Sequence, residues 1–161
     1  MVGPGSSQPS AERRLQELGI VLPNAPHPLG AYVEAVQSGS LLFLSGMLPL
    51  KDGKLQYIGR LGKEFNADAG RDALRTAALN ALSAARENLG SLDRVNKVVR
   101  VGVYLATSGD FYNQPIVADA ASELLRDVFG EGKTSVRSVF GVASLPLGAP
   151  VMLEVTFEVK S

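Results

Sequence analysis

The strict alternation of side chains over residues 151–159 constrains the fold more than any other feature of the sequence. Successive residues of a β-strand point to opposite faces of a sheet, so a period of two separates the faces. One face carries Val151, Leu153, Val155, Phe157 and Val159, and the other carries Met152, Glu154, Thr156 and Glu158. The sequence therefore predicts a strand that buries one face, with its carboxylates on the solvated side.

Two amphipathic helices are predicted from the apolar spacing. In the longer one, Asn66 is suited to be the N-cap and Gly90 the C-cap, and apolar residues recur at helical spacing at Leu74, Ala77, Ala81, Leu82, Ala85 and Leu89. The second helix should begin near Asn113, because Pro115 fits the first turn of a helix and not its interior. Its buried stripe would comprise Val117, Ala121, Leu124 and Val128.

Five further strands are expected, over residues 31–37, 41–45, 55–58, 95–105 and 136–142. The turn signals Ser38-Gly39-Ser40 and Asp52-Gly53 separate the first three. The strand over 95–105 would place four apolar residues on one face, Val99, Val101, Val103 and Leu105. A short helix over residues 11–18 precedes the strands, with Ser10 as its cap, Leu15 and Leu18 facing inward and Gly19 at its end.

This order of strands, helix, strand, helix and strands predicts an α+β fold, a mixed sheet with two helices packed on one face. No helix is left to cover the other face. The apolar residues of that face need a partner, and another copy of the chain is the simplest one. The sequence therefore predicts a homo-oligomer.

The amino-acid composition argues against several classes of function. Lys plus Arg and Asp plus Glu are equal at 16 each, whereas proteins that hold nucleic acid through its phosphates carry a basic excess. Because the chain has no cysteine and one histidine, His27, a zinc site or a Ser-His-Asp triad would depend on that residue alone. We expect His27 to have a loop role. Neither a metal site nor a nucleic-acid partner is expected.

One domain is expected over residues 10–161, preceded by a flexible tail over residues 1–9. The tail is rich in Gly, Ser and Pro and has neither the basic nor the apolar region of a signal peptide. No apolar run approaches the roughly 20 residues that span a membrane. The predicted protein is soluble and cytoplasmic, with no membrane partner.

Arg137 is the most informative candidate for chemistry, because it interrupts an otherwise apolar strand. A buried guanidinium needs a partner, and its fork suits a carboxylate. That carboxylate could belong to a ligand or to an Asp or Glu of the chain, and the residues alone leave the two interpretations equal. Tyr32 and Ser45-Gly46 are weaker candidates, since a half-exposed tyrosine and a turn at the end of a strand would account for them.

Two segments resemble the Rid (reactive intermediate deaminase, YjgF-like) family. The first contains Pro28 to Tyr32 and then Leu42 to Pro49, which is similar to the opening motif of these proteins. The second runs from Val136-Arg137-Ser138-Val139 to Ala149 and is similar to their closing motif. The order of elements matches from Tyr32 to Val159.

The resemblance implies a chorismate-mutase-like fold, a homotrimer, and ligand sites in clefts between subunits. It implies that Arg137 binds the carboxylate of a 2-imino or 2-enamino acid, with Tyr32, Ser45, Gly46 and Ser138 as further contacts. Such enzymes hydrolyse the imine to a keto acid and ammonia without a metal or other cofactor.

Several positions depart from the family pattern. The glutamate that assists water in deaminating members falls at Met152, and Glu154, one step further on the same strand face, is the candidate to replace it. Met47 and Val139 stand where relatives have glutamine and, in some, cysteine. The helix near Asn113 and the extension over residues 10–24 differ from the shortest members. Three functions remain: a deaminase, a non-catalytic binding or regulatory trimer, and, less favoured, a ribonuclease or translation inhibitor.

Overall fold

The computed structural model describes residues 8–161, so residues 1–7 of the expected tail lie outside its described part. Five strands form one mixed sheet in the order β1-β2-β7-β5-β6. All neighbours are antiparallel except β5 and β6, which are parallel. In chain order these strands are β1 (Ala35–Ser38), β2 (Leu41–Leu44), β5 (Val95–Ala106), β6 (Val136–Val142) and β7 (Val151–Val159). A separate hairpin contains β3 (Leu50–Lys51) and β4 (Lys54–Leu55).

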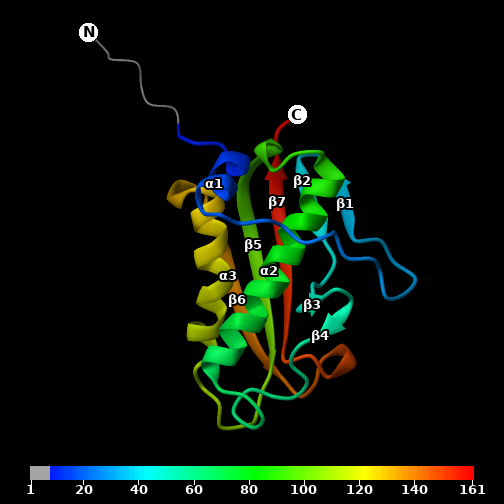
Figure 1. Ribbon diagram of the computed structural model, residues 1–161, viewed down its shortest axis with the longest axis vertical. Helices are drawn as coiled ribbons and strands as arrows, with labels where there is room; N and C mark the ends of the chain where they lie inside the picture. The colour runs from blue at the N-terminus through cyan, green and yellow to red at the C-terminus, as the bar shows by residue number, and fades with distance from the viewer. Residues whose placement is uncertain (1–7) are drawn as a thin grey trace.

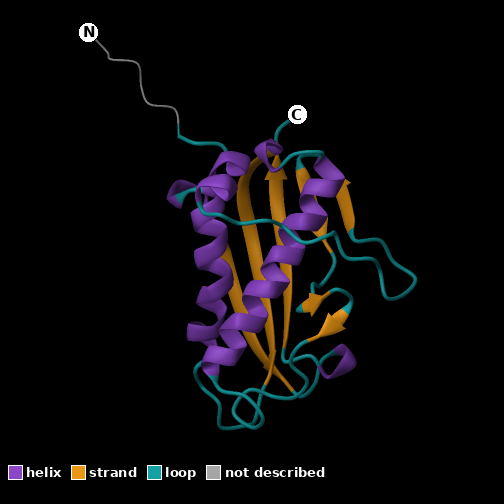
Figure 2. Ribbon diagram, in the orientation of Figure 1, coloured by secondary structure: helices purple, strands orange, loops and turns teal. Residues whose placement is uncertain are grey.

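Two long helices cover one face of the sheet as a single layer (Figures 1 and 2). They are α2 (Ala67–Leu89) and α3 (Gln114–Phe129), and α1 (Ala11–Glu17) packs at the end of α3. Short 3₁₀ turns are η1 (Leu92–Arg94), η2 (Glu131–Lys133) and η3 (Pro146–Gly148). The predicted α+β fold with two helices on one face is therefore confirmed.

The core lies between this helical layer and β7 with β5. All five apolar residues of the predicted β7 face are buried, and the alternate residues are half-buried. Asn66 caps α2 as predicted, with its Oδ1 accepting a hydrogen bond from the Ala69 N–H at 2.9 Å, and Gly90 ends the helix in the left-handed region at φ 83°. The predicted stripe of α3 is buried as well. The sequence periodicities therefore identify the packed faces of β7 and α3 correctly.

Two buried polar side chains of α2 fix neighbouring loops. The Asn80 amide donates to the carbonyls of Leu48 and Leu50 at 3.0 and 2.9 Å. The Ser83 hydroxyl donates to the carbonyl of Pro23 at 2.8 Å. Because each donor has its partner, burial costs little, and the segment before β1 and the segment after β2 are tied to the helix.

The structure corrects the predicted face of β5. Val98, Val101, Val103 and Leu105 are buried, and Val99 is not among them. The pairing with β7 shifts by one residue between Val95 and Lys97 and again between Val98 and Arg100. Each shift is a bulge, which inserts one residue and reverses the alternation of faces.

Three other boundaries also differ from the prediction. Leu18 is exposed, because α1 ends at Glu17 and only Ala11 and Leu15 face the core. The first strand begins at Ala35 and not at residue 31, since residues 29–32 form bends. After the turn at Asp52-Gly53, the strand covers Lys54–Leu55 and stops before Ile58, which is exposed.

The face of the sheet opposite the helices, here called the open face, carries both apolar and charged side chains. Its exposed apolar residues are Val36, Phe43, Val136 and Phe140. The uncovered apolar residues that the sequence predicts for this face are therefore valine and phenylalanine side chains. None of the helices within residues 8–161 has the length and apolar character to cross a membrane.

Glu12 attaches α1 to the rest of the protein. Its two carboxylate oxygens accept from the Arg86 guanidinium at 3.1 and 2.6 Å, and Oε1 also accepts from the Leu92 N–H at 2.9 Å. Burial raises the pKa of Glu12, but these hydrogen bonds and the charge of Arg86 outweigh it, so the net pKa is below the ordinary value. A depressed carboxyl pKa stabilises the fold above the unfolded-state pKa, and this stabilisation is lost as the pH falls.

We therefore expect Glu12→Gln to lower the free energy of unfolding by about 1–2 kcal/mol at neutral pH, because charge-assisted hydrogen bonds become neutral ones. Chemical denaturation should show this difference shrinking below the ordinary carboxyl pKa of 4.5. Glu17→Gln is the matched control, since Glu17 pairs with Arg13 at the surface, where the two side chains are 53% and 72% exposed. An equal effect of both variants at neutral pH would contradict this role of Glu12.

Candidate functional site

Arg137 lies on β6, at one edge of the sheet, and its side chain is on the helical side. This direction follows from its pairing with Val101, whose side chain is buried under the helices. Nη1 of Arg137 donates to Asp119 Oδ1 at 2.7 Å and to Ser122 Oγ at 3.1 Å, both on α3. An ion pair of Arg137 with an acid of the chain, one of the two interpretations from the sequence, is thus present.

The ion pair leaves part of the guanidinium available. Nη1 carries two N–H groups and has two acceptors, whereas Nε and Nη2 have no hydrogen-bond partner within residues 8–161. Nε and Nη2 together form the side of the fork that binds a carboxylate with two parallel bonds. The ion pair with Asp119 is therefore compatible with ligand binding on the other side of the same group.

Tyr32, Ser45 and Gly46 lie near the other edge of the sheet. Tyr32 is in the bends before β1, and its hydroxyl accepts from the Leu29 N–H at 3.1 Å. Ser45 follows β2, and its hydroxyl donates to the Val33 carbonyl at 2.6 Å. Ser45 thus holds the segment of Tyr32 against the end of β2.

A bulge lies at Ser45 and Gly46. Phe43 pairs with Thr156 and Met47 with Leu153. The chain therefore advances four residues from Phe43 to Met47 while β7 advances only three, which leaves one extra residue. A Cβ atom on Gly46 would lie 2.7 Å from the sulfur of Met152. Glycine therefore lets the backbone approach Met152 closely, and these residues belong to one cluster.

Glu154 lies on the open face, next to this bulge. Its Oε2 is 3.9 Å from Nη1 of Arg100, with both side chains 40% exposed. Gly102, the β5 partner of Glu154, makes room for this contact, since a Cβ there would lie 3.1 Å from Nη1 of Arg100. Glu154 is thus within reach of a cation and of solvent. Ser138 also pairs with Gly102 and shares this open face, opposite to the side chain of Arg137.

Apart from Ser138, the candidate residues form two groups, one at the β6 edge and one that extends from the segment before β1 to the middle strand β7. We call Arg137 with Asp119 and Ser122 the arginine half-site. The tyrosine half-site contains Tyr32, Ser45, Gly46, Met152 and Glu154. From β6 to β1 there are four strand spacings, which is roughly 19 Å at about 4.8 Å each. One chain does not bring Arg137 and Tyr32 together.

Glu34, beside the tyrosine half-site, has a pKa above the ordinary value for a glutamate. Burial raises this pKa, and the positive charge of His27 partly offsets the effect. His27 itself lies in the exposed loop before β1. An acid with a raised folded-state pKa favours the fold when protonated and loses that contribution as the pH rises. Within residues 8–161 no three His, Asp or Glu side chains gather as a metal site would require.

Sequence reasoning missed Asp119, Ser122 and Arg100. Asp119 and Ser122 are three residues apart on α3, which places them on the same helix face, and each adjoins the predicted buried stripe. That spacing shows a polar pair on one face of the helix, but only the tertiary structure shows that this face meets β6. Alternation with Val101 puts Arg100 on the open face, but its contact with Glu154 depends on the pairing of β5 with β7, which the sequence alone does not give.

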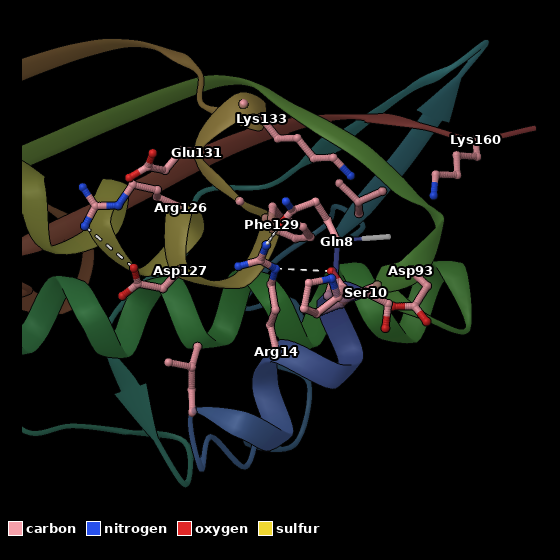
Figure 3. Close-up of a pocket in the computed structure, with 17 residues that line it drawn as sticks. Gln8, Ser10, Arg14, Asp93, Arg126, Asp127, Phe129, Glu131, Lys133 and Lys160 are labelled. Carbon is pink, nitrogen blue, oxygen red and sulfur yellow. Dashed lines mark hydrogen bonds and ion pairs between the residues drawn. The ribbon is translucent and has the colours of Figure 1, made fainter. Parts of the chain in front are cut away.

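A pocket of about 960 Å³ lies at another place in the fold. It is lined by α1, the end of α3, η2 and Lys160, and Figure 3 shows Arg14 donating to Gln8 within it. None of the predicted site residues lines this pocket. The arginine half-site lies instead at the β6 edge of the sheet, and the tyrosine half-site extends from the segment before β1 to β7.

Comparison with known proteins gives consistent results. A family model described as "YjgF/chorismate mutase-like, putative endoribonuclease" matches residues 12–159. Protein TCP17 of Trypanosoma cruzi is 41% identical over 149 residues, which are 91% of this chain and 92% of that protein. The 2-iminobutanoate/2-iminopropanoate deaminase of Dermatophagoides farinae is 30% identical over 135 residues, or 84% and 91%. The crystal structure of a putative endoribonuclease from Shewanella oneidensis MR-1 has a TM-score of 0.90 at 31% identity, covering 94% of this chain and 100% of that one.

Proposed function

The chain belongs to the YjgF/chorismate mutase-like family, and from this premise we propose that it binds a 2-imino or 2-enamino acid and hydrolyses it to a keto acid and ammonia. The ligand would lie in a cleft between two copies of a homotrimer. A relative with 30% identity carries the name of such a deaminase, which supports the reaction class.

The observation that carries the proposal is the unused side of the Arg137 guanidinium. Asp119 and Ser122 hold Nη1, so the group is oriented before a ligand arrives. Nε and Nη2 can then bind the carboxylate of the acid in a bidentate manner. Because the guanidinium is already oriented, it loses little conformational entropy when a ligand binds, and this favours ligand binding.

Two copies of the chain would complete the site. A ring of subunits can bring the arginine half-site of one copy against the tyrosine half-site of the next. The exposed Val36, Phe43, Val136 and Phe140 of the open face offer the apolar surface that such a ring buries.

The reaction needs water, a fixed carbon and a path for protons. Water adds to the imine carbon and gives a carbinolamine, with one proton of the water passing to the nitrogen. The second proton follows as the C–N bond breaks, so ammonia leaves with both and the water oxygen stays as the keto oxygen. Glu154 is the carboxylate of the tyrosine half-site that could carry these protons from oxygen to nitrogen. Arg137 would hold the ligand, and the backbone at Ser45-Gly46 would approach it closely.

A second candidate function is non-catalytic binding of a small carboxylate by the same trimer. Met152 favours it, because a thioether can neither accept nor donate a proton for the reaction. The formal net charge of 0 gives no support to RNA cleavage.

We expect light scattering on the purified protein to report three chains per particle.

Mixed trimers test whether the site is shared between chains. Arg137→Ala and Tyr32→Phe chains should each lose ligand binding or turnover. If the chains are unfolded and reassembled together in equal amounts, random assortment should restore about one quarter of the sites, because each restored site takes one intact half-site from each variant. A mixture as inactive as its components, or a monomer at micromolar concentration, would refute the shared site.

Arg137→Ala should weaken binding of 2-oxobutanoate, the keto acid of the proposed reaction, by about 1.5–3 kcal/mol in calorimetry, as expected for a charge-assisted contact. The melting temperature should change little, because the Asp119 side chain is 51% exposed and can be hydrated alone. Arg71→Ala is the control, since Arg71 of α2 forms a similar 2.7 Å pair with another acid of α3, Glu123, and is not part of the arginine half-site. A collapse of stability with unchanged affinity would leave Arg137 a structural residue only.

Met152→Glu should raise the rate of ammonia release from freshly generated 2-imino acids, and we expect the native rate to be low. Positioned acid–base groups typically contribute about 10²–10⁴-fold. Met152→Gln is the control, because it has similar size and polarity without a basic carboxylate. Fast native turnover that Glu154→Gln abolishes would assign the role to Glu154. Fast turnover that survives both Met152→Gln and Glu154→Gln would mean that neither position matters.

A further inference from the structure

We infer that Asp119 is a specificity-determining residue, which makes the arginine half-site prefer ligands with a cationic nitrogen beside the carboxylate over plain carboxylates. The inference rests on the proposed function, because it requires Arg137 to bind the carboxylate. It adds a role for an acid on α3 that the proposed reaction does not use.

The first step is the position of the Asp119 carboxylate. Its Oδ1 lies 2.7 Å from Nη1 of Arg137, and its side chain is 51% exposed. Oδ2 has no hydrogen-bond partner within residues 8–161. A ligand carboxylate on Nε and Nη2 would be separated from Asp119 by the width of one guanidinium, about the 4–6 Å at which nearby charges act on each other. Asp119 would therefore act on any ligand that Arg137 holds.

The second step is the sum of charges. Arg137 and Asp119 together are neutral, so a plain carboxylate would gain hydrogen bonds from the fork but meet repulsion from Asp119. A ligand with an ammonium or iminium group on the adjacent carbon brings its own positive charge. That charge offsets part of the repulsion, acting on Asp119 through space across the guanidinium.

This preference would also separate substrate from product. The protonated imine and water have the same atoms and charge as the keto acid and ammonium: R–C(=NH₂⁺)–COO⁻ + H₂O gives R–C(=O)–COO⁻ + NH₄⁺. When the C–N bond breaks, the positive charge leaves with ammonium. The keto acid then keeps the repulsion from Asp119 and has lost the attraction, which favours its release.

A structural role alone would not require Asp119. The arginine side chain is 25% exposed and the aspartate 51%, and ion pairs near the surface contribute little to stability. Ser122 also accepts from the same nitrogen, so the orientation of the guanidinium has a second support. Asp119 can thus be changed while Arg137 keeps an anchor.

The test compares two stable ligands with one carbon skeleton, L-2-aminobutanoate and 2-oxobutanoate, by calorimetry with the full chain. The amino acid stands in for the cationic imino acid, and its ammonium nitrogen represents the iminium nitrogen. We expect the parent protein to bind the amino acid about tenfold more tightly, which corresponds to about 1.4 kcal/mol of charge interaction across the guanidinium. Asp119→Asn should abolish this preference by weakening the amino acid and strengthening the keto acid.

Ser122→Ala is the matched control, because it removes the other partner of Nη1 without changing charge. It should alter both affinities alike and leave their ratio unchanged. If both ligands bind the parent but Asp119→Asn leaves the ratio unchanged, the role of Asp119 is refuted and the Arg137 anchor stands. If Asp119→Asn weakens both ligands equally, Asp119 only orients Arg137. If neither ligand binds the parent, the proposed function fails with this inference.

Discussion

The burial of β7 and β5 under α2 and α3 is the constraint on which the rest of the structure depends. Phe157, Leu153 and Leu105 are fully buried at this contact, and burying a side chain of this size contributes about 1.5–3 kcal/mol. Because alternate residues of a strand face opposite ways, this contact also decides which residues face outward. Glu154, Met152 and the exposed phenylalanines are on the open face for this reason.

The same constraint divides the candidate site. β6 pairs in parallel with β5, so Arg137 shares the helical side with Val101 and meets α3. β2 pairs with the edge of β7 that β5 does not occupy, and β1 pairs with β2. The residues of the tyrosine half-site that precede β1 or follow β2 therefore lie on the side of β7 away from β6. The sheet order therefore prevents one chain from bringing the two groups together, and an assembled site is the geometry in which both can touch one ligand. The proposed trimer and the proposed ligand site depend on the same edges.

Helix caps, buried stripes and the alternation of β7 could be predicted from the sequence, because each depends on neighbours within one element. Asn66 and Gly90 are examples, since their roles are local. The bulges in β5 could not be predicted, because they arise from the pairing with β7 and move Val99 away from the core. The same holds for the arginine half-site. The family motif indicated Arg137, but its partner Asp119 lies 18 residues earlier, on α3, and only the packing of α3 on β6 brings the two together.

The relative size of two catalytic effects explains how Met152 can be reconciled with a deaminase. Good positioning of reactants can remove about 7–11 kcal/mol from a barrier, whereas a positioned acid or base contributes about 10²–10⁴-fold, or roughly 3–5 kcal/mol. A thioether in place of a carboxylate removes only the smaller effect. The oriented guanidinium of Arg137 and the close backbone at Gly46 would preserve much of the larger one. Reduced turnover with retained recognition is therefore the behaviour that this combination of residues favours.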